Sequence, residues 1–221
     1  MSSVAEGLAQ VQRRIEAACA RAHRSPTSVQ LVAVSKRHPP KAVRAAYEAG
    51  QRLFGENYAQ ELRDKAAELA DLRGLRWHAI GPLQINKAKY VARSAHVFHA
   101  LDRLEVAQEL SKRRTGAPLD CLVEVNLGGE AQKGGVALPK VEPLVRAVQK
   151  LPHLRLVGLM CLPPLGATAE ASRPYFRRLS ELGRALLLPE LSMGSTFDFE
   201  VAIEEGATFV RVGTAIFGER G

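Results

Sequence analysis

The sequence predicts an α/β protein, a single (β/α)8 TIM barrel with an extra helix at its N-terminus. Two observations carry this prediction. Short, β-branched apolar runs alternate with amphipathic stretches along the chain, which is typical of proteins built on a parallel sheet. Eight such runs occur within the 221 residues, and eight strands are the number that closes a barrel of this kind. A doubly wound open sheet is the alternative, since a strand count from sequence carries an error of about one or two.

The chain begins with a helix and a strand. From residue 4 to residue 22, apolar residues recur at steps of three and four and arginines occupy the other face, which predicts an amphipathic helix. Residues 30–34 read QLVAV, a run typical of a strand that is buried on both faces of a parallel sheet. Pro39 and Pro40 then begin a second helix, and Gly50 ends it.

The same alternation continues to the end of the chain. The other predicted strands are residues 52–54, 77–80, 97–100, 121–125, 156–160, 190–193 and 208–211. The predicted helices between them are residues 59–72, 84–92, 104–114, 139–149, 172–186 and 200–205. The glycine-rich segment 128–135 is interpreted as a mobile loop after the fifth strand. Because no linker or low-complexity segment interrupts the pattern, residues 1–221 are predicted to form one domain.

The composition excludes several classes of protein. An apolar fraction of 46% and a charged fraction of 24% are globular averages, so a disordered, collagen-like or coiled-coil chain is excluded. The net charge of +8 favours anionic partners. Nucleic acid is not expected among them, because aromatic residues make up only 5% of the chain and the charges are scattered over the predicted helices.

Three cysteines without CxxC spacing, Cys19, Cys121 and Cys161, indicate neither a disulfide framework nor a zinc site. His96 and His99 are three residues apart, so on one strand they point to opposite faces and make a poor metal pair. Charged residues interrupt the apolar pattern of the N-terminus, and no run is long enough to span a bilayer. A cytoplasmic protein without a membrane or metal partner is therefore expected.

Polar and small residues follow the predicted strands at their carboxyl ends, where barrels of this type carry their functional sites. The last strand runs into a short helix at Gly213 and Thr214, an arrangement that often binds phosphate through backbone N–H groups. Gly213 permits close backbone approach and Thr214 adds a hydroxyl. Residues 194–196 would form the other half of this cradle, although such residues also serve as ordinary helix caps.

Lys36 directly follows the first predicted strand. A desolvated amine has a lowered pKa and can form a Schiff base, but a lysine at this place can also extend to the rim or pair with Glu56. Arg211 poses a similar choice between a structural ion pair with a carboxylate and contact with a ligand's phosphate or ring nitrogen. Asn57 and Asn126 are more typical of loop caps, and His78 of a hydrogen-bonded core histidine.

Seven segments carry a resemblance to a known family. They are LVAVSK at 31–36, FGENYAQE at 54–61, WHAIGPLQINK at 77–87, VNLGGEAQKGG at 125–135, GLMC at 158–161, LSMGSTFDFEVAI at 191–203 and VRVGTAIFGER at 210–220. Through them the chain resembles the pyridoxal phosphate homeostasis protein family (YggS/PROSC family), whose fold resembles the barrel domain of alanine racemase. The resemblance implies that pyridoxal 5′-phosphate (PLP) binds to Lys36 as an internal aldimine.

The resemblance also assigns roles to other residues. Arg211 would face the pyridine nitrogen, which an arginine keeps unprotonated. Thr196, Gly213 and Thr214 would hold the phosphate, and Asn57 would lie beside the ring. The family usually reads SMGMS at the seventh strand, where this chain reads SMGST, so the hydroxyl at the phosphate position is kept.

The family has no established catalytic turnover, which implies a protein that holds PLP, acts in vitamin B6 homeostasis and passes the cofactor to recipient PLP-dependent enzymes. No catalytic residue is predicted, because the second domain that supplies a tyrosine base to racemases is not seen in the sequence. For the same reason a monomer is expected. The alternatives are a small PLP-dependent amino-acid racemase or related enzyme with Lys36 as its only base, and an aldolase that uses Lys36 without cofactor.

Overall fold

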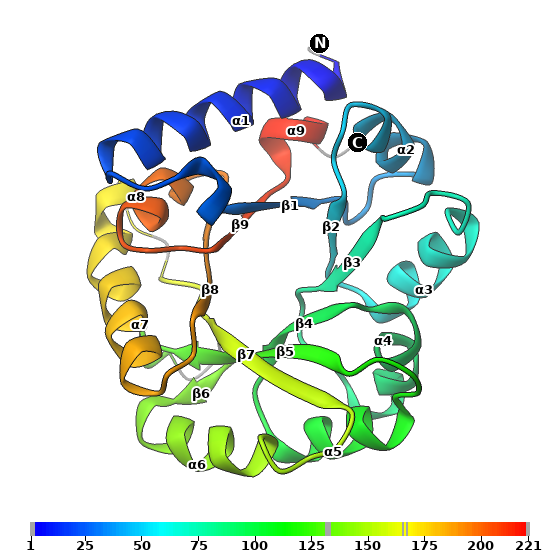
Figure 1. The fold of residues 1–221 in the computed structure, drawn as a ribbon, viewed down its shortest axis with the longest axis vertical. Helices are drawn as coiled ribbons and strands as arrows, with labels where there is room; N and C mark the ends of the chain where they lie inside the picture. Colours follow the sequence, from blue (N-terminus) through cyan, green and yellow to red (C-terminus); the bar gives the residue numbers. More distant parts are fainter. Residues whose placement is uncertain (1–2, 131–133, 165, 167, 220–221) are drawn as a thin grey trace.

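The strands form a closed parallel barrel (Figure 1). The computed structural model describes residues 3–130, 134–164, 166 and 168–219. The barrel strands are β1 (Gln30–Val34), β2 (Leu53–Glu56), β3 (Arg76–Ala79), β4 (Val97–Leu101), β5 (Leu119–Asn126), β7 (Leu154–Met160), β8 (Glu190–Ser195) and β9 (Phe209–Val212). Each pairs in parallel with the next, and β9 pairs with β1, so the sheet has no open edge. The (β/α)8 prediction is confirmed, and the doubly wound open sheet is excluded.

Helices surround the barrel on the outside (Figure 1). They are α1 (Val4–Arg21), α2 (Pro40–Glu48), α3 (Ala59–Glu68), α4 (Ala88–Ser94), α5 (Leu104–Arg113), α6 (Leu138–Val148), α7 (Arg173–Ala185), α8 (Phe199–Glu204) and α9 (Thr214–Phe217). Short 3-10 helices occur at Pro26–Ser28, Ile85–Lys87 and Ala169–Ser172.

Two helices and one short strand differ most from the sequence prediction. The helix predicted for residues 59–72 ends at Glu68, because the chain turns through tight hydrogen bonds from Leu69 to Gly74, whose φ is +77°. The helix predicted for residues 84–92 starts as a 3-10 turn before α4 begins. A two-residue strand, β6 (Val136–Ala137), pairs with the end of β5 directly after the glycine-rich segment. Within that segment, residues 131–133 lie outside the described residues, so the interpretation as a mobile loop stays a prediction.

The extra N-terminal helix completes the outer layer of the barrel. Helices α8 and α9 are short, and α1 packs across both of them (Figure 1). Gly7 permits this packing, because a Cβ at this position would lie only 2.7 Å from the carbonyl oxygen of Ala215 in α9. A capping box between Ser3 and Glu6 begins the helix. The prediction that this helix flanks the barrel is thereby confirmed.

Alternation along the strands separates the barrel interior from the layer under the helices. On β3, Trp77 packs near Phe54 with ring centroids 6.0 Å apart, whereas the next residue, His78, contacts His99 of the neighbouring strand. His78 is hydrogen-bonded and buried, as predicted for a core histidine. Among the described residues, no helix is long and apolar enough to cross a membrane, and no three metal-ligating side chains cluster.

Candidate functional site

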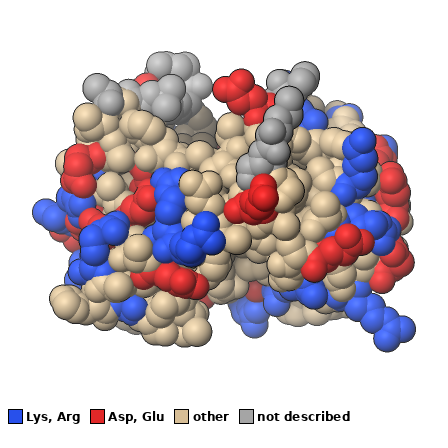
Figure 2. Space-filling view, turned by 90° about the horizontal axis from the view of Figure 1, so that it is seen from above, with Lys and Arg blue, Asp and Glu red and all other residues tan. Residues whose placement is uncertain are grey.

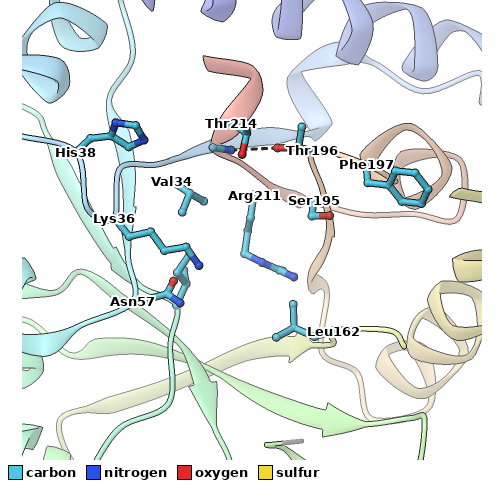
Figure 3. A pocket seen from close by; sticks show the side chains of 12 residues that line it. Val34, Lys36, His38, Asn57, Leu162, Ser195, Thr196, Phe197, Arg211 and Thr214 are labelled. Carbon is cyan, nitrogen blue, oxygen red and sulfur yellow. Dashed lines mark hydrogen bonds between the residues drawn. The ribbon is translucent and has the colours of Figure 1, made fainter. Parts of the chain in front are cut away.

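The six site residues predicted from the sequence line one cavity at the carboxyl ends of the strands (Figure 3). The cavity has a volume of about 320 Å³. Its lining comprises Lys36, Asn57, Thr196, Arg211, Gly213 and Thr214, together with Val34, His38, Ile80, Leu162, Ser195 and Phe197. Parallel strands all end on the same side of the barrel, which explains why residues so far apart in the sequence meet there. Their binding roles remain predictions.

A buried polar cluster fixes the turn that carries Lys36. Ser35 Oγ donates a hydrogen bond to Glu56 Oε1 at 2.7 Å, and Lys65 Nζ donates to the Ser35 carbonyl oxygen at 2.7 Å. On the other side of Lys36, the backbone N–H of Arg37 donates to Glu61 Oε1 at 2.6 Å. Both neighbours of Lys36 are therefore held, and the Lys36 side chain extends into the cavity toward Asn57 (Figure 3).

Glu56 forms its ion pair with Lys65. The Lys65 Nζ lies 2.7 Å from Glu56 Oε1, and the two side chains are 5% and 0% exposed. Sequence reasoning offered Glu56 as a partner of Lys36 and did not identify Lys65, because nothing in the pattern of α3 distinguishes an inward-facing lysine from a solvated one. Burial raises the pKa of Glu56 to about 7, against the opposing effect of Lys65.

The loops after β8 and β9 form the opposite wall. The backbone N–H of Gly213 donates to Thr196 Oγ1 at 3.3 Å, which joins the two loops (Figure 3). A Cβ at Gly213 would lie 3.1 Å from the Val34 carbonyl oxygen, so this close approach favours glycine. Asp198 accepts hydrogen bonds from the Ser195 N–H and hydroxyl at 2.8 and 2.9 Å and holds the β8 loop in place.

Arg211 forms part of the cavity from the middle of β9 and is 6% exposed. Its Nη1 donates to Ser192 Oγ at 2.6 Å and its Nη2 to the Cys161 carbonyl oxygen at 3.1 Å. Within the part of the chain that the structure describes, no carboxylate forms an ion pair with it, so the structural ion pair considered above is wrong. Burial lowers the pKa of this guanidinium.

Other polar residues at the strand ends have structural partners. Asn126 donates to the Glu130 carbonyl oxygen at 2.9 Å and caps a loop, in agreement with the sequence interpretation. Asp102 pairs with Arg103 at 2.7 Å.

Sequence reasoning missed Ser192, which binds Arg211, and Glu124, a buried carboxyl on β5. The inward phase of the strand alternation could have identified both residues, but not their partners.

Glu124 is expected to make the stability of the barrel depend on pH. Burial and the charge of Asp102 raise its pKa to about 7 from an ordinary 4.5, with Arg211 opposing. Between these values the folded protein holds a proton that the unfolded chain releases, so the stabilising contribution is lost as the pH rises through about 7. We therefore expect Glu124→Gln, which stays neutral, to be more stable than the unsubstituted protein at pH 8 by about 1–3 kcal/mol.

Urea unfolding of both proteins from pH 5 to 8.5 measures this difference, which should shrink toward pH 5. Glu68→Gln is the matched control, because Glu68 is exposed on α3 and should show no such pH dependence. A Glu124→Gln variant that is equally destabilised at every pH would contradict the expectation.

Comparisons with known proteins agree on one family. The alanine racemase N-terminal domain family model matches residues 7–221. A pyridoxal phosphate homeostasis protein of Pseudomonas aeruginosa is 49% identical over 224 residues, covering 100% of this chain and 97% of the relative. The structure of PipY from Synechococcus elongatus PCC7942 with PLP bound is 37% identical with a TM-score of 0.84, covering 98% of this chain and 100% of that one.

Alanine racemase from Corynebacterium glutamicum shares the fold. It is 19% identical with a TM-score of 0.69, and the match covers 97% of this chain but 61% of the racemase.

Proposed function

This chain belongs to the alanine racemase N-terminal domain family, and we propose that it binds pyridoxal 5′-phosphate and acts in the homeostasis of this cofactor. One observation carries the proposal: the lysine, the arginine and the phosphate-type cradle implied by the family resemblance line the same cavity. The relatives named for PLP homeostasis, and the PLP-bound structure of PipY, support the choice of ligand.

The chemistry of the cavity wall fits this cofactor. Lys36 presents an amine, the group that an aldehyde captures as a Schiff base. Arg211 presents guanidinium donors, which suit an unprotonated ring nitrogen because arginine cannot accept a hydrogen bond. The backbone at Gly213 and the hydroxyls of Thr196 and Thr214 suit a phosphate. When bound, PLP supplies an electron-accepting ring, and an arginine at the ring nitrogen weakens that property.

We propose a carrier rather than an enzyme. The relatives are named as homeostasis proteins, and Arg211 beside the ring nitrogen would weaken electron withdrawal by PLP. The protein would hold PLP on Lys36 and release it to recipient PLP-dependent enzymes in the cytoplasm. We propose that the protein is a monomer of one domain, residues 1–221. Lys and Arg side chains lie among Asp and Glu on the face in Figure 2, which does not favour a nucleic-acid partner.

The test is the visible absorption spectrum of the purified protein after addition of PLP, followed by borohydride reduction and peptide mass mapping. We expect a yellow Schiff-base band and a reduced adduct on Lys36. The absence of this band, or an adduct spread over surface lysines, would contradict the proposal. Incorporation of solvent deuterium at the α position of an amino acid by the loaded protein would instead favour the enzyme.

A further inference from the structure

A chain of four hydrogen-bonded side chains crosses the interior of the barrel. It starts at Arg211 in the cavity, where Nη1 lies 2.6 Å from Ser192 Oγ. Ser192 Oγ lies 2.8 Å from His99 Nδ1, and His99 Nε2 lies 2.8 Å from His78 Nδ1. His78 also lines a second cavity of about 480 Å³, formed by residues at the amino ends of the strands. None of the four side chains is more than 6% exposed.

His78 and His99, the two histidines in this series of hydrogen bonds, are expected to be neutral. Burial lowers the pKa of His78 to about 3, and Arg76 and His96 act in the same direction. Burial also lowers the pKa of His99 well below its usual range, with His78 and Arg211 as the charged or titratable neighbours. A neutral imidazole carries one proton, so each ring has one donor and one acceptor nitrogen.

The guanidinium sets the direction of the chain. Arg211 can only donate, so Ser192 Oγ accepts, and the hydroxyl hydrogen of Ser192 is left for His99 Nδ1. His99 then carries its proton on Nε2 and donates it to His78 Nδ1. His78 in turn is protonated on Nε2, an atom without a hydrogen-bond partner among the described residues.

The opposite direction satisfies fewer groups. If His99 donated from Nδ1, Ser192 Oγ would accept from both Arg211 and His99, and its own hydrogen would have no acceptor among the described residues. A buried hydroxyl without an acceptor is costly. The direction away from Arg211 leaves only His78 Nε2 without a partner.

We propose that Ser192 and His99 are positioning residues for Arg211: they turn the lone pairs of the Ser192 hydroxyl toward the guanidinium and hold it in one orientation in the cavity. This inference rests on the proposed function for its consequence, because a fixed guanidinium can meet the ring nitrogen of PLP without first being ordered. The direction of the chain itself is a property of the protein without ligand.

The first test uses the protein without PLP. Long-range ¹H–¹⁵N NMR correlations of histidine-labelled protein report which ring nitrogen carries the proton, with His78 and His99 assigned by single substitutions. We expect both rings in the Nε2–H form, unchanged from pH 5.5 to 8. An Nδ1–H form of His99, or protonation of His99 within this range, would overturn the proposal.

The second test measures PLP binding. Ser192→Ala removes both hydrogen bonds, and His99→Phe removes the acceptor for the serine hydroxyl while keeping a ring of similar size. We expect each to weaken PLP binding about tenfold and to shift the absorption maximum of the bound cofactor. Ser192→Thr, which keeps the hydroxyl, should restore the absorption maximum.

Ser111→Ala is the matched control, because Ser111 is, like Ser192, a buried serine with a hydrogen bond. It donates to the carbonyl oxygen of Pro152 and does not line the cavity. It should change neither readout. The borohydride adduct on Lys36 should persist in every variant, which separates this inference from the proposed function. If the adduct persists and neither Ser192→Ala nor His99→Phe changes the spectrum or the affinity, the positioning role is wrong while PLP binding stands.

Discussion

Replacing Lys36 with alanine is expected to abolish the covalent attachment of PLP. Lys36 supplies the amine in a cavity whose other walls carry Arg211 and the Gly213 cradle, and the variant leaves both in place. Noncovalent binding through these groups would remain. We therefore expect the Schiff-base absorption band and the reduced adduct found by mass mapping after borohydride reduction to be lost. The affinity for PLP, measured by dialysis, should fall on the order of a hundredfold.

Lys87→Ala is the control for this experiment. Lys87 lines a neighbouring cavity that shares Asn57 with the first, so it tests a second lysine close to the site. This variant should keep the full band and the adduct on Lys36. A Lys36→Ala protein that still forms a specific adduct, on Lys87 or elsewhere, would contradict the assignment of Lys36.

The second large effect is expected at Lys65, which does not line the cavity. Lys65→Met removes the cation beside Glu56, whose side chain is fully buried, and leaves an uncompensated carboxylate. Breaking a buried pair in this way costs about 3–5 kcal/mol of unfolding free energy. Because Glu56 has a pKa raised to about 7, protonation relieves part of this cost at low pH. The loss should therefore be larger at pH 8 than at pH 5.5.

Urea unfolding at both pH values checks this expectation. Adding Glu56→Gln to Lys65→Met removes the buried charge and should recover more than half of the lost stability at pH 8. Arg113→Met is the control, since it breaks the exposed pair with Glu109 on α5 and should cost less than about 1 kcal/mol. A loss at Lys65 as small as at Arg113 would show that the buried pair does not stabilise the fold.

The hydrogen bonds of Lys65 and Glu61 also link the stability of the fold to the position of Lys36. Lys65 Nζ holds the Ser35 carbonyl oxygen, and Glu61 holds the Arg37 N–H, so the turn that carries Lys36 depends on α3. A Lys65→Met protein that remains folded at pH 5.5 should therefore form the adduct on Lys36 more slowly, which stopped-flow absorption can follow.

Much of the fold could be predicted from local pattern. The run QLVAV in β1 and the alternation around Trp77 and His78 reflect burial on one or both faces of a strand. Such burial can be recognised from residues that are close together in the sequence. Boundaries were less accurate where tight turns competed with helix, as after Glu68. The two-residue strand β6 was missed, because two residues are too short a run to show a strand pattern, and only its pairing with the end of β5 reveals it.

The sequence by itself determined that strands and helices alternate, that eight strands build the barrel, and which residues follow each strand, among them Lys36 and Arg211. Only the tertiary structure decided the partners of those residues: Lys65 for Glu56, and Ser192 and His99 for Arg211. The physical reason is that apolar periodicity records whether a side chain is buried, which is a local property. Which two polar side chains meet inside a barrel depends on strand register and closure, which no local segment specifies.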